Sequence, residues 1–146
     1  MGKLKRKLSL LNIPVYDIKD EGEIYNVLLS HLELTGEVGD KLNLCFAEKG
    51  TSSFSFDRNL SFVVFKMLLA VEESSILFVD KRVNDNIKSI DMPHYTVLII
   101  QERDVVDNIE LALHRIASGS GYSNEYIEII YPNSISSNSI VLIVKD

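Results

Sequence analysis

Cys45 is the single cysteine among the 146 residues, and tryptophan is absent. One cysteine can form neither an intrachain disulfide nor a cysteine-rich metal site, so we expect a reducing compartment. Three prolines and seven glycines exclude a collagen-like or linker-rich chain. Hydrophobic residues make up 46% of the sequence, which is enough to bury one core.

Long hydrophobic runs are also missing. The longest one, residues 60–71, is interrupted by Lys66 and falls short of the roughly 20 residues that span a bilayer. The apolar stretch that follows Lys7 stops at Asn12, too early for a signal peptide. The sequence therefore predicts a cytoplasmic protein, with peripheral contact at the inner face of the membrane as its closest approach to lipid.

Acidic residues outnumber basic ones, and the net charge is −6. Residues 1–20 hold five basic and two acidic side chains, which gives +3. The remaining 126 residues hold ten basic and 19 acidic side chains, which gives −9. Because phosphate contacts need a basic face, this acidic body argues against a nucleic-acid partner.

The first half of the chain alternates between strand and helix patterns. The apolar residues of 4–18 predict one or two strands broken near Pro14. Asp20 followed by Glu23 is typical of a capping box, so a helix is expected from there to Gly36. Residues 42–46 then alternate as a strand does.

A second pattern in this half predicts a hairpin and a central helix. Phe54 and Phe56 suggest a strand that returns from residues 42–46 through Lys49 and Gly50. Residues 58–73 carry apolar side chains at helical spacing and on the other faces too, and they predict a helix buried on several sides. Its apolar stripe consists of Leu60, Val63, Val64, Met67, Leu68 and Val71.

The second half predicts further strands and helices in alternation. Those expected are a strand at 76–79, a short helix at 83–90, a strand at 95–100, an amphipathic helix over 106–116, and strands at 126–131 and 140–144. Residues 132–139 are rich in serine and asparagine and are expected to form a hairpin tip between the last two strands.

This order predicts an α/β fold. A mixed parallel and antiparallel sheet flanked by about three main helices would form one layered domain over residues 1–146. An apolar strand at 140–144 lies next to the end of the sequence. That position leaves open the possibility that the chain is the N-terminal domain of a longer protein.

Several segments contain residue types found in functional sites, but a structural role is the simpler interpretation for each. The glycine-rich residues 118–121 follow a helix, whereas phosphate loops precede one. His31, His94 and His114 lack the i, i+4 histidine pair of zinc hydrolases. Cys45 lies in an alternating strand without a nearby base. We therefore predict neither a cofactor nor a metal.

Carboxylates at the ends of predicted strands are compatible with a metal-dependent enzyme. Asp17, Asp57 and Asp80 each fall where a predicted strand ends, and such groups can bind magnesium. A helix cap at Asp57 and a turn residue at Asp80 are the simpler interpretations.

The basic segment near the start is the one charged feature with a possible role in binding. Lys3, Lys5, Arg6 and Lys7 could be the lysine-rich face of an edge strand, which discourages aggregation. They could also attract an acidic protein or the anionic inner leaflet.

Three functions follow from these observations. The first is a non-catalytic domain that binds another protein, for instance as a cytoplasmic scaffold of a bacterial pilus or secretion machine. The second is a small acidic immunity protein or antitoxin that captures a basic toxin, which the charge of −9 would favour. The third is a small metal-dependent enzyme built on Asp17, Asp57 or Asp80.

Overall fold

The computed structural model describes residues 2–35, 42–46, 60–80, 95–118, 127–135 and 138–146. Within these ranges the helices are α1 (Gly2–Leu10), α2 (Ile24–Thr35) and α4 (Ile109–Ala117). The strands are β1 (Val15–Ile18), β2 (Leu42–Phe46), β3 (Leu60–Lys66), β4 (Leu69–Val71), β5 (Leu77–Asp80), β6 (Tyr95–Gln101), β7 (Val105–Val106), β8 (Ile127–Ile130) and β9 (Ser139–Val144).

The strands form two sheets. One has five strands in the order β1-β9-β6-β3-β2, and each neighbouring pair is parallel. The other has four strands in the order β7-β4-β5-β8, with antiparallel pairing of β4 with β5 and of β5 with β8, and parallel pairing of β4 with β7. The α/β class with parallel and antiparallel strands is thus confirmed, although the strands are divided between two sheets instead of sharing one.

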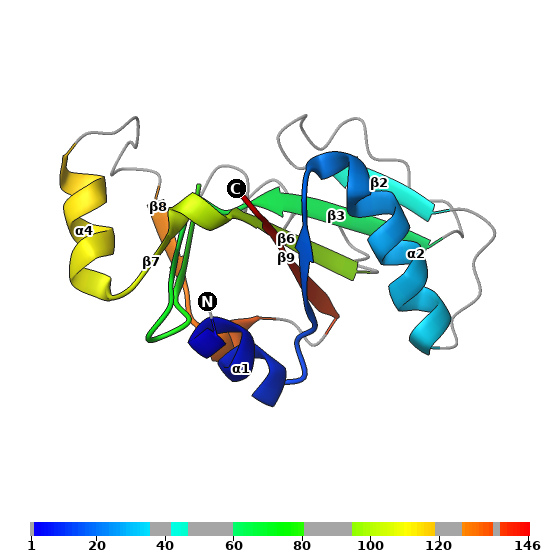
Figure 1. Cartoon of the computed structure of the whole chain (residues 1–146), viewed down its shortest axis with the longest axis horizontal. Helices are drawn as coiled ribbons and strands as arrows, with labels where there is room; N and C mark the ends of the chain where they lie inside the picture. The colour runs from blue at the N-terminus through cyan, green and yellow to red at the C-terminus, as the bar shows by residue number, and fades with distance from the viewer. Residues whose placement is uncertain (1, 36–41, 47–59, 81–94, 119–126, 136–137) are drawn as a thin grey trace.

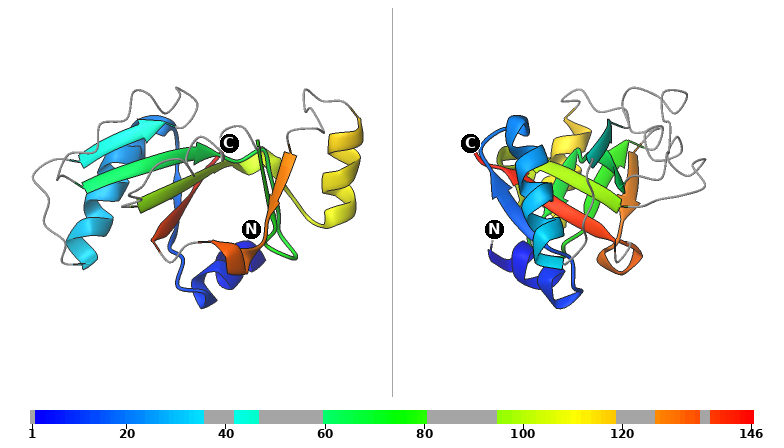
Figure 2. Two further views of the ribbon diagram at one scale, coloured as in Figure 1. Left: turned by 180° about the vertical axis from the view of Figure 1, so that it is seen from behind. Right: turned by 90° about the vertical axis from the view of Figure 1, so that its right-hand side faces the viewer.

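The elements stack in layers (Figure 1). Helix α2 covers the outer face of the five-stranded sheet, and α4 lies on the outer face of the four-stranded sheet at the opposite end of the molecule. Helix α1 closes the space between the sheets along one side, as the view from behind also shows (Figure 2). Three apolar clusters fill the spaces between these layers.

The predicted helix over residues 58–73 is wrong. Its described part consists of strands β3 and β4, which lie in different sheets. Along β3, Phe62 and Val64 pack toward α2, whereas Val63 and Phe65 pack between the sheets. A strand buried on both faces has apolar side chains at successive positions, so its sequence resembles that of a buried helix.

The prediction of strands throughout residues 4–18 is partly wrong. Residues Gly2–Leu10 form α1, in which Leu4 and Leu8 lie one turn apart and are fully buried. The strand that follows Pro14 is confirmed as β1. Between them Asn12 has a φ of 62°, a left-handed conformation that asparagine tolerates better than most residues.

The helix expected after Asp20 is confirmed. The Asp20 side chain accepts a hydrogen bond from the Gly22 amide at 2.8 Å, a short 3₁₀ turn follows, and α2 begins at Ile24. The predicted strands at residues 42–46, 76–79 and 95–100 are confirmed as β2, β5 and β6.

The end of the chain differs from the prediction in two places. Val106 belongs to β7, and α4 begins after Asn108, whose side chain accepts a hydrogen bond from the Leu111 amide at 3.0 Å. Strands β8 and β9 are confirmed, but they lie in different sheets, so residues 132–139 connect the sheets and are not the tip of a hairpin. The predicted strand at 54–56 and the helix at 83–90 lie outside the described residues.

Candidate functional site

The predicted basic segment lies on α1. The inner face of this helix is buried, and the Lys5 ammonium pairs with the Asp17 carboxylate of β1 at 2.6 Å. Lys3, Arg6 and Lys7 are exposed on the outer face. These residues therefore belong to a helix packed on the core and not to an edge strand.

A buried carboxylate holds the start of this helix. Glu72 follows β4, is 8% exposed, and its Oε1 accepts hydrogen bonds from the amides of Lys3 (2.7 Å) and Leu4 (3.1 Å). Burial works to raise the pKa of Glu72, but the N-terminal amino group and these two amides outweigh it and lower the pKa. Glu72 thus supplies, from a distant part of the sequence, the acceptor that a helix N-terminus needs.

Of the three carboxylates proposed for a metal, the two that the structure describes, Asp17 and Asp80, lie in different sheets. Asp17 lies on the edge strand β1 and is paired with Lys5, whereas Asp80 ends β5 in the other sheet. Asp57 lies outside the described residues. Within the described parts of the chain, there is no cluster of three or more histidine, cysteine or acidic residues that could hold a metal ion.

The other sequence candidates have structural settings where they are described. The Nδ1 of His31 lies 2.8 Å from the hydroxyl of Tyr16, which ties α2 to β1. His114 is exposed near the end of α4. Cys45 lies on β2, but the structure does not describe its side chain. His94, Gly119 and Gly121 lie outside the described residues.

A crevice at the carboxyl ends of β1 and β9 is where parallel sheets often bind small ligands. It has a volume of about 620 Å³ and is lined by Asp17, Ile18, Lys19, Glu23, Lys145 and Asp146. Two of these charges are already engaged, because Lys145 is ion-paired with Glu102 and Asp17 with Lys5. The Lys145 ammonium lowers the pKa of Glu102 by hydrogen bonding. Internal ion pairs therefore already neutralise two of the charges that line the crevice.

The exposed apolar residues gather elsewhere, on α4 and β8. Among the described residues, eight large apolar side chains are exposed, and five of them belong to these elements. They are Ile109 (36%), Leu111 (46%) and Leu113 (52%) on α4, Ile129 (41%) on β8, and Tyr131 (56%) directly after β8. Leu111 lies on the side of α4 toward β7, away from Leu113 and Ile129, so we call the other four residues the α4–β8 face.

This face follows from the way α4 packs. The sequence predicts that Ile109, Leu113 and Ile116 point into the core. In the structure, Ala112 is the fully buried residue of α4, and Ile116 is partly buried beside it. Because the helix contacts the sheet through alanine, its leucines remain in solvent on either side.

Two grooves flank α4. The groove toward β8 is apolar, has a volume of about 350 Å³ and is lined by Phe78, Leu113, Ile116, Ala117, Ile127 and Ile129. The groove toward β7 has a volume of about 410 Å³ and contains polar groups as well, its lining being Val105, Val106, Asp107, Leu111, His114, Arg115 and Ser118.

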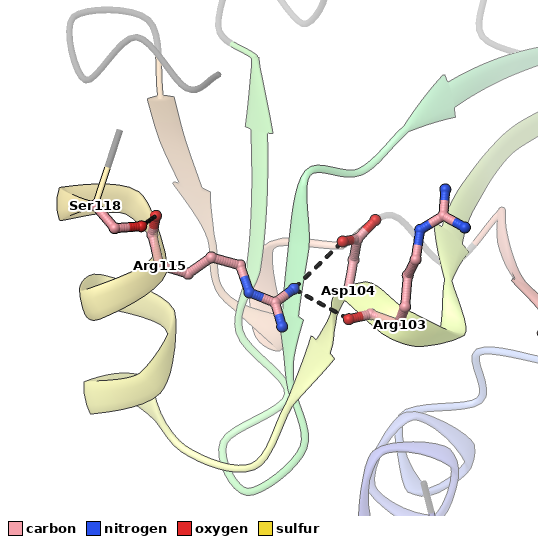
Figure 3. Close-up of polar contacts among 4 residues, drawn as sticks. All are labelled: Arg103, Asp104, Arg115 and Ser118. Atoms are coloured by element: carbon pink, nitrogen blue, oxygen red, sulfur yellow. Dashed lines mark hydrogen bonds and ion pairs between the residues drawn. The ribbon is translucent and has the colours of Figure 1, made fainter. Parts of the chain in front are cut away.

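Arg115 fixes α4 against the turn between β6 and β7 (Figure 3). Its guanidinium donates to the carbonyl of Arg103 at 3.0 Å and to the Asp104 carboxylate at 3.3 Å. Burial raises the pKa of Asp104, although the positive charges of Arg115 and Arg103 work to lower it. The backbone carbonyl of Arg115 accepts a hydrogen bond from the Ser118 hydroxyl at 2.9 Å. The contacts of the Arg115 guanidinium therefore hold α4, which carries part of the α4–β8 face, against the turn between β6 and β7.

Comparisons with known proteins support the fold. No protein-family model matches the chain, and no curated protein matches it. The chain resembles the crystal structure of a DUF162 family protein from Deinococcus radiodurans, with a TM-score of 0.57 over 99% of this chain and 98% of that one. Only 10% of the residues are identical. The similarity therefore concerns the arrangement of helices and strands.

The α4–β8 face is difficult to predict from the sequence. A helix whose apolar residues lie at core spacing is normally buried, and β8 contains three isoleucines in four positions. The feature of the sequence that could indicate this face is the small Ala112 among the larger apolar residues of the helix. Among the described residues, no helix is both long and apolar enough to cross a bilayer.

Proposed function

We infer that this domain is a non-catalytic protein-binding module whose partner docks on the α4–β8 face. The presence of four of the eight exposed large apolar side chains on this face, beside an apolar groove, carries the proposal. Exposed apolar surface of this kind costs free energy in water, and on folded proteins it commonly marks a site that another protein covers. The partner protein would make this domain one component of an assembly.

The chemistry of the face favours an extended segment as the bound part of the partner. Strand β8 is at the end of its sheet, and among the described strands it pairs with β5 alone. An extended peptide can add to such an edge through its backbone. Its apolar side chains can then enter the groove between Leu113 and Ile129, where removing apolar surface from water supplies the affinity.

Photo-crosslinking in cells of the source organism tests this proposal. Tyr131, at the face, is replaced by p-benzoylphenylalanine, and Tyr25 on α2 is replaced in the same way as a matched control. Both tyrosines are exposed, at 56% and 43%, and they belong to different elements, since Tyr131 directly follows β8 and Tyr25 lies on α2. We expect one predominant crosslinked protein from position 131 and none of it from position 25.

A second change establishes which surface the partner uses. Ile129→Asp places a charge in the apolar groove and should reduce the crosslink at position 131 at least ten-fold, since burying an unpaired carboxylate is costly. Crosslinks of equal yield at both positions, or a product that persists with Ile129→Asp, would contradict the proposal. A crosslink to a second copy of this chain would replace the partner protein by a homodimer.

A further inference from the structure

We propose that the outer face of α1 attaches the protein to an anionic lipid surface. This inference concerns a different side of the molecule from the α4–β8 face and does not depend on the function proposed above. It rests on a row of side chains that the helix presents to solvent. The row consists of Lys3, Arg6, Lys7 and Leu10, and we call it the basic stripe.

The spacing of these residues places them together. Positions 3, 6, 7 and 10 follow the i, i+3, i+4, i+7 pattern, so they lie on one side of a helix. Leu4 and Leu8, both fully buried, define the opposite side. The sequence of α1 contains no acidic residue, so its own helix offers the three cations no neutralising partner.

The stripe also carries an apolar group that the fold leaves in water. Leu10 is 78% exposed, which is the largest value among the exposed apolar side chains of the described residues. Leu11 beside it is 37% exposed. A cationic row that ends in exposed leucine has the two features by which interfacial helices bind bilayers, namely attraction to anionic headgroups and burial of apolar side chains at the acyl boundary.

The helix is held firmly enough to present this surface. Its inner leucines belong to the apolar cluster between the sheets, and Glu72 binds the first amides of the helix. Like charges at i, i+3 and i+4 repel one another, so the core contacts and Glu72 must offset that repulsion. An anionic surface would relieve it.

An anionic lipid surface explains the stripe better than a nucleic acid does. Phosphates of a nucleic acid would engage the three cations but would leave Leu10 in water. An anionic bilayer can attract the cationic side chains of this helix through its headgroups and bury its exposed leucine at the acyl boundary. Three cations with one or two leucines give weak, reversible attachment.

Vesicle sedimentation with the full chain tests the assignment. The probes are vesicles of phosphatidylcholine alone and of phosphatidylcholine with 30% phosphatidylglycerol, at low salt. We expect binding to the anionic vesicles only. Each cation removed from the stripe should lower the partition coefficient about five-fold, so the triple change Lys3→Gln, Arg6→Gln, Lys7→Gln should lower it about 100-fold.

Two further variants separate the stripe from net charge. Lys19 is exposed and lies outside the stripe, so Lys19→Gln changes the net charge as Lys7→Gln does but should leave binding within two-fold of wild type. Leu10→Ser should reduce binding about ten-fold by removing the apolar contact. These positions are exposed, and circular dichroism with an unchanged unfolding midpoint verifies the fold of each variant.

Three outcomes would overturn the assignment. Equal effects of Lys19→Gln and Lys7→Gln would indicate attraction by overall charge. Binding to the anionic vesicles that is unchanged by Leu10→Ser would mean that charge alone attaches the helix, and Leu10 would no longer favour lipid over a nucleic acid. Binding to duplex DNA that the triple change abolishes, with none to the anionic vesicles, would assign the stripe to nucleic acid.

Discussion

Strands β8 and β9 have similar apolar content and very different surroundings. β8 contains three isoleucines in four residues, and β9 contains five isoleucine, leucine or valine residues in six. Every residue of β9 is buried, because the strand lies between β1 and β6 with apolar clusters on both faces. β8 is at the end of its sheet, and Ile129 remains 41% exposed.

The difference shows that the position of an apolar strand in its sheet determines how much of its apolar surface is buried when the chain folds. Isoleucine in β9 contributes to folding, since its methyl groups leave water when the chain folds. Ile129 in β8 leaves part of its apolar surface in water, and under the proposed function a partner protein would cover it. The helices repeat the contrast, because α1 is anchored by two fully buried leucines, whereas α4 is anchored by an alanine and Arg115.

The largest effect is expected from Leu142→Ala in β9. Leu142 is fully buried, and truncating it should lower the free energy of unfolding by about 2–5 kcal/mol, through lost transfer free energy and the cavity that remains. Ile129→Ala in β8 is the matched change and should cost less than about 1 kcal/mol, because much of that side chain is already in water. Urea denaturation followed by circular dichroism measures both.

This pair of variants can break the comparison. If Ile129→Ala destabilised the protein as much as Leu142→Ala, β8 would be part of the core, and the α4–β8 face would lose its distinction. If Ile129→Ala left stability intact and weakened the crosslink from position 131, the division between folding and binding would be sharpened.

An intermediate effect is expected at the anchor of α1. Glu72→Ala removes the acceptor for the amides of Lys3 and Leu4 and should lower the free energy of unfolding by about 1–3 kcal/mol. A normal stability for this variant would mean that the buried leucines alone hold the helix. The polar contact of Glu72 would then contribute no more to the free energy of unfolding than the polar contact that holds α4.

The charge of Glu72 predicts a pH dependence as well. Its pKa in the folded protein lies below the usual value, so its ionised form stabilises the fold above about pH 4.5, and this stabilisation is lost as pH falls through the folded pKa. Glu72→Gln removes this contribution. The unfolding free energy of wild type should therefore fall more steeply between pH 5 and 3 than that of Glu72→Gln.

Local patterns predicted much of the fold, and they failed where burial on two faces removed the periodicity. The alternation of polar and apolar residues predicted β2, and Asp20 with Glu23 predicted the entry into α2. The sequence of β3 predicts a helix wrongly because Phe62 and Val63 point into different apolar clusters, so the strand has no polar face. Its valines and phenylalanines were the signal that favoured strand.

The division into two sheets depends on contacts between distant residues. β8 and β9 follow one another in the sequence and resemble a hairpin, yet β9 pairs with β1 and β6, and β8 pairs with β5. The candidate face has the same origin, since only the packing of Ala112 against the sheet decides that Leu113 stays outside. Residue spacing alone cannot indicate which stripe of a largely apolar helix will be buried.

The smallest effect is expected at the anchor of α4. Arg115→Ala removes a partly exposed ion pair and a hydrogen bond to the Arg103 carbonyl, and should lower the free energy of unfolding by about 0.5–1 kcal/mol. Arg103→Ala keeps that carbonyl and is the matched control, with a smaller cost. Denaturation at pH 7 measures both.

The sign of the pH dependence at this anchor is opposite to that of Glu72. Asp104 has a raised pKa in the folded protein, so the stability linked to its protonated form is present at acid pH and is lost as pH rises through the folded pKa. Arg115→Ala removes a positive charge that lowers this pKa, and its cost should therefore be greater at pH 7 than at pH 4. Adding Asp104→Asn should recover part of the loss at pH 7. An equal cost at both pH values would mean that Arg115 holds α4 through the Arg103 carbonyl, and that the ion pair contributes nothing to the position of the α4–β8 face.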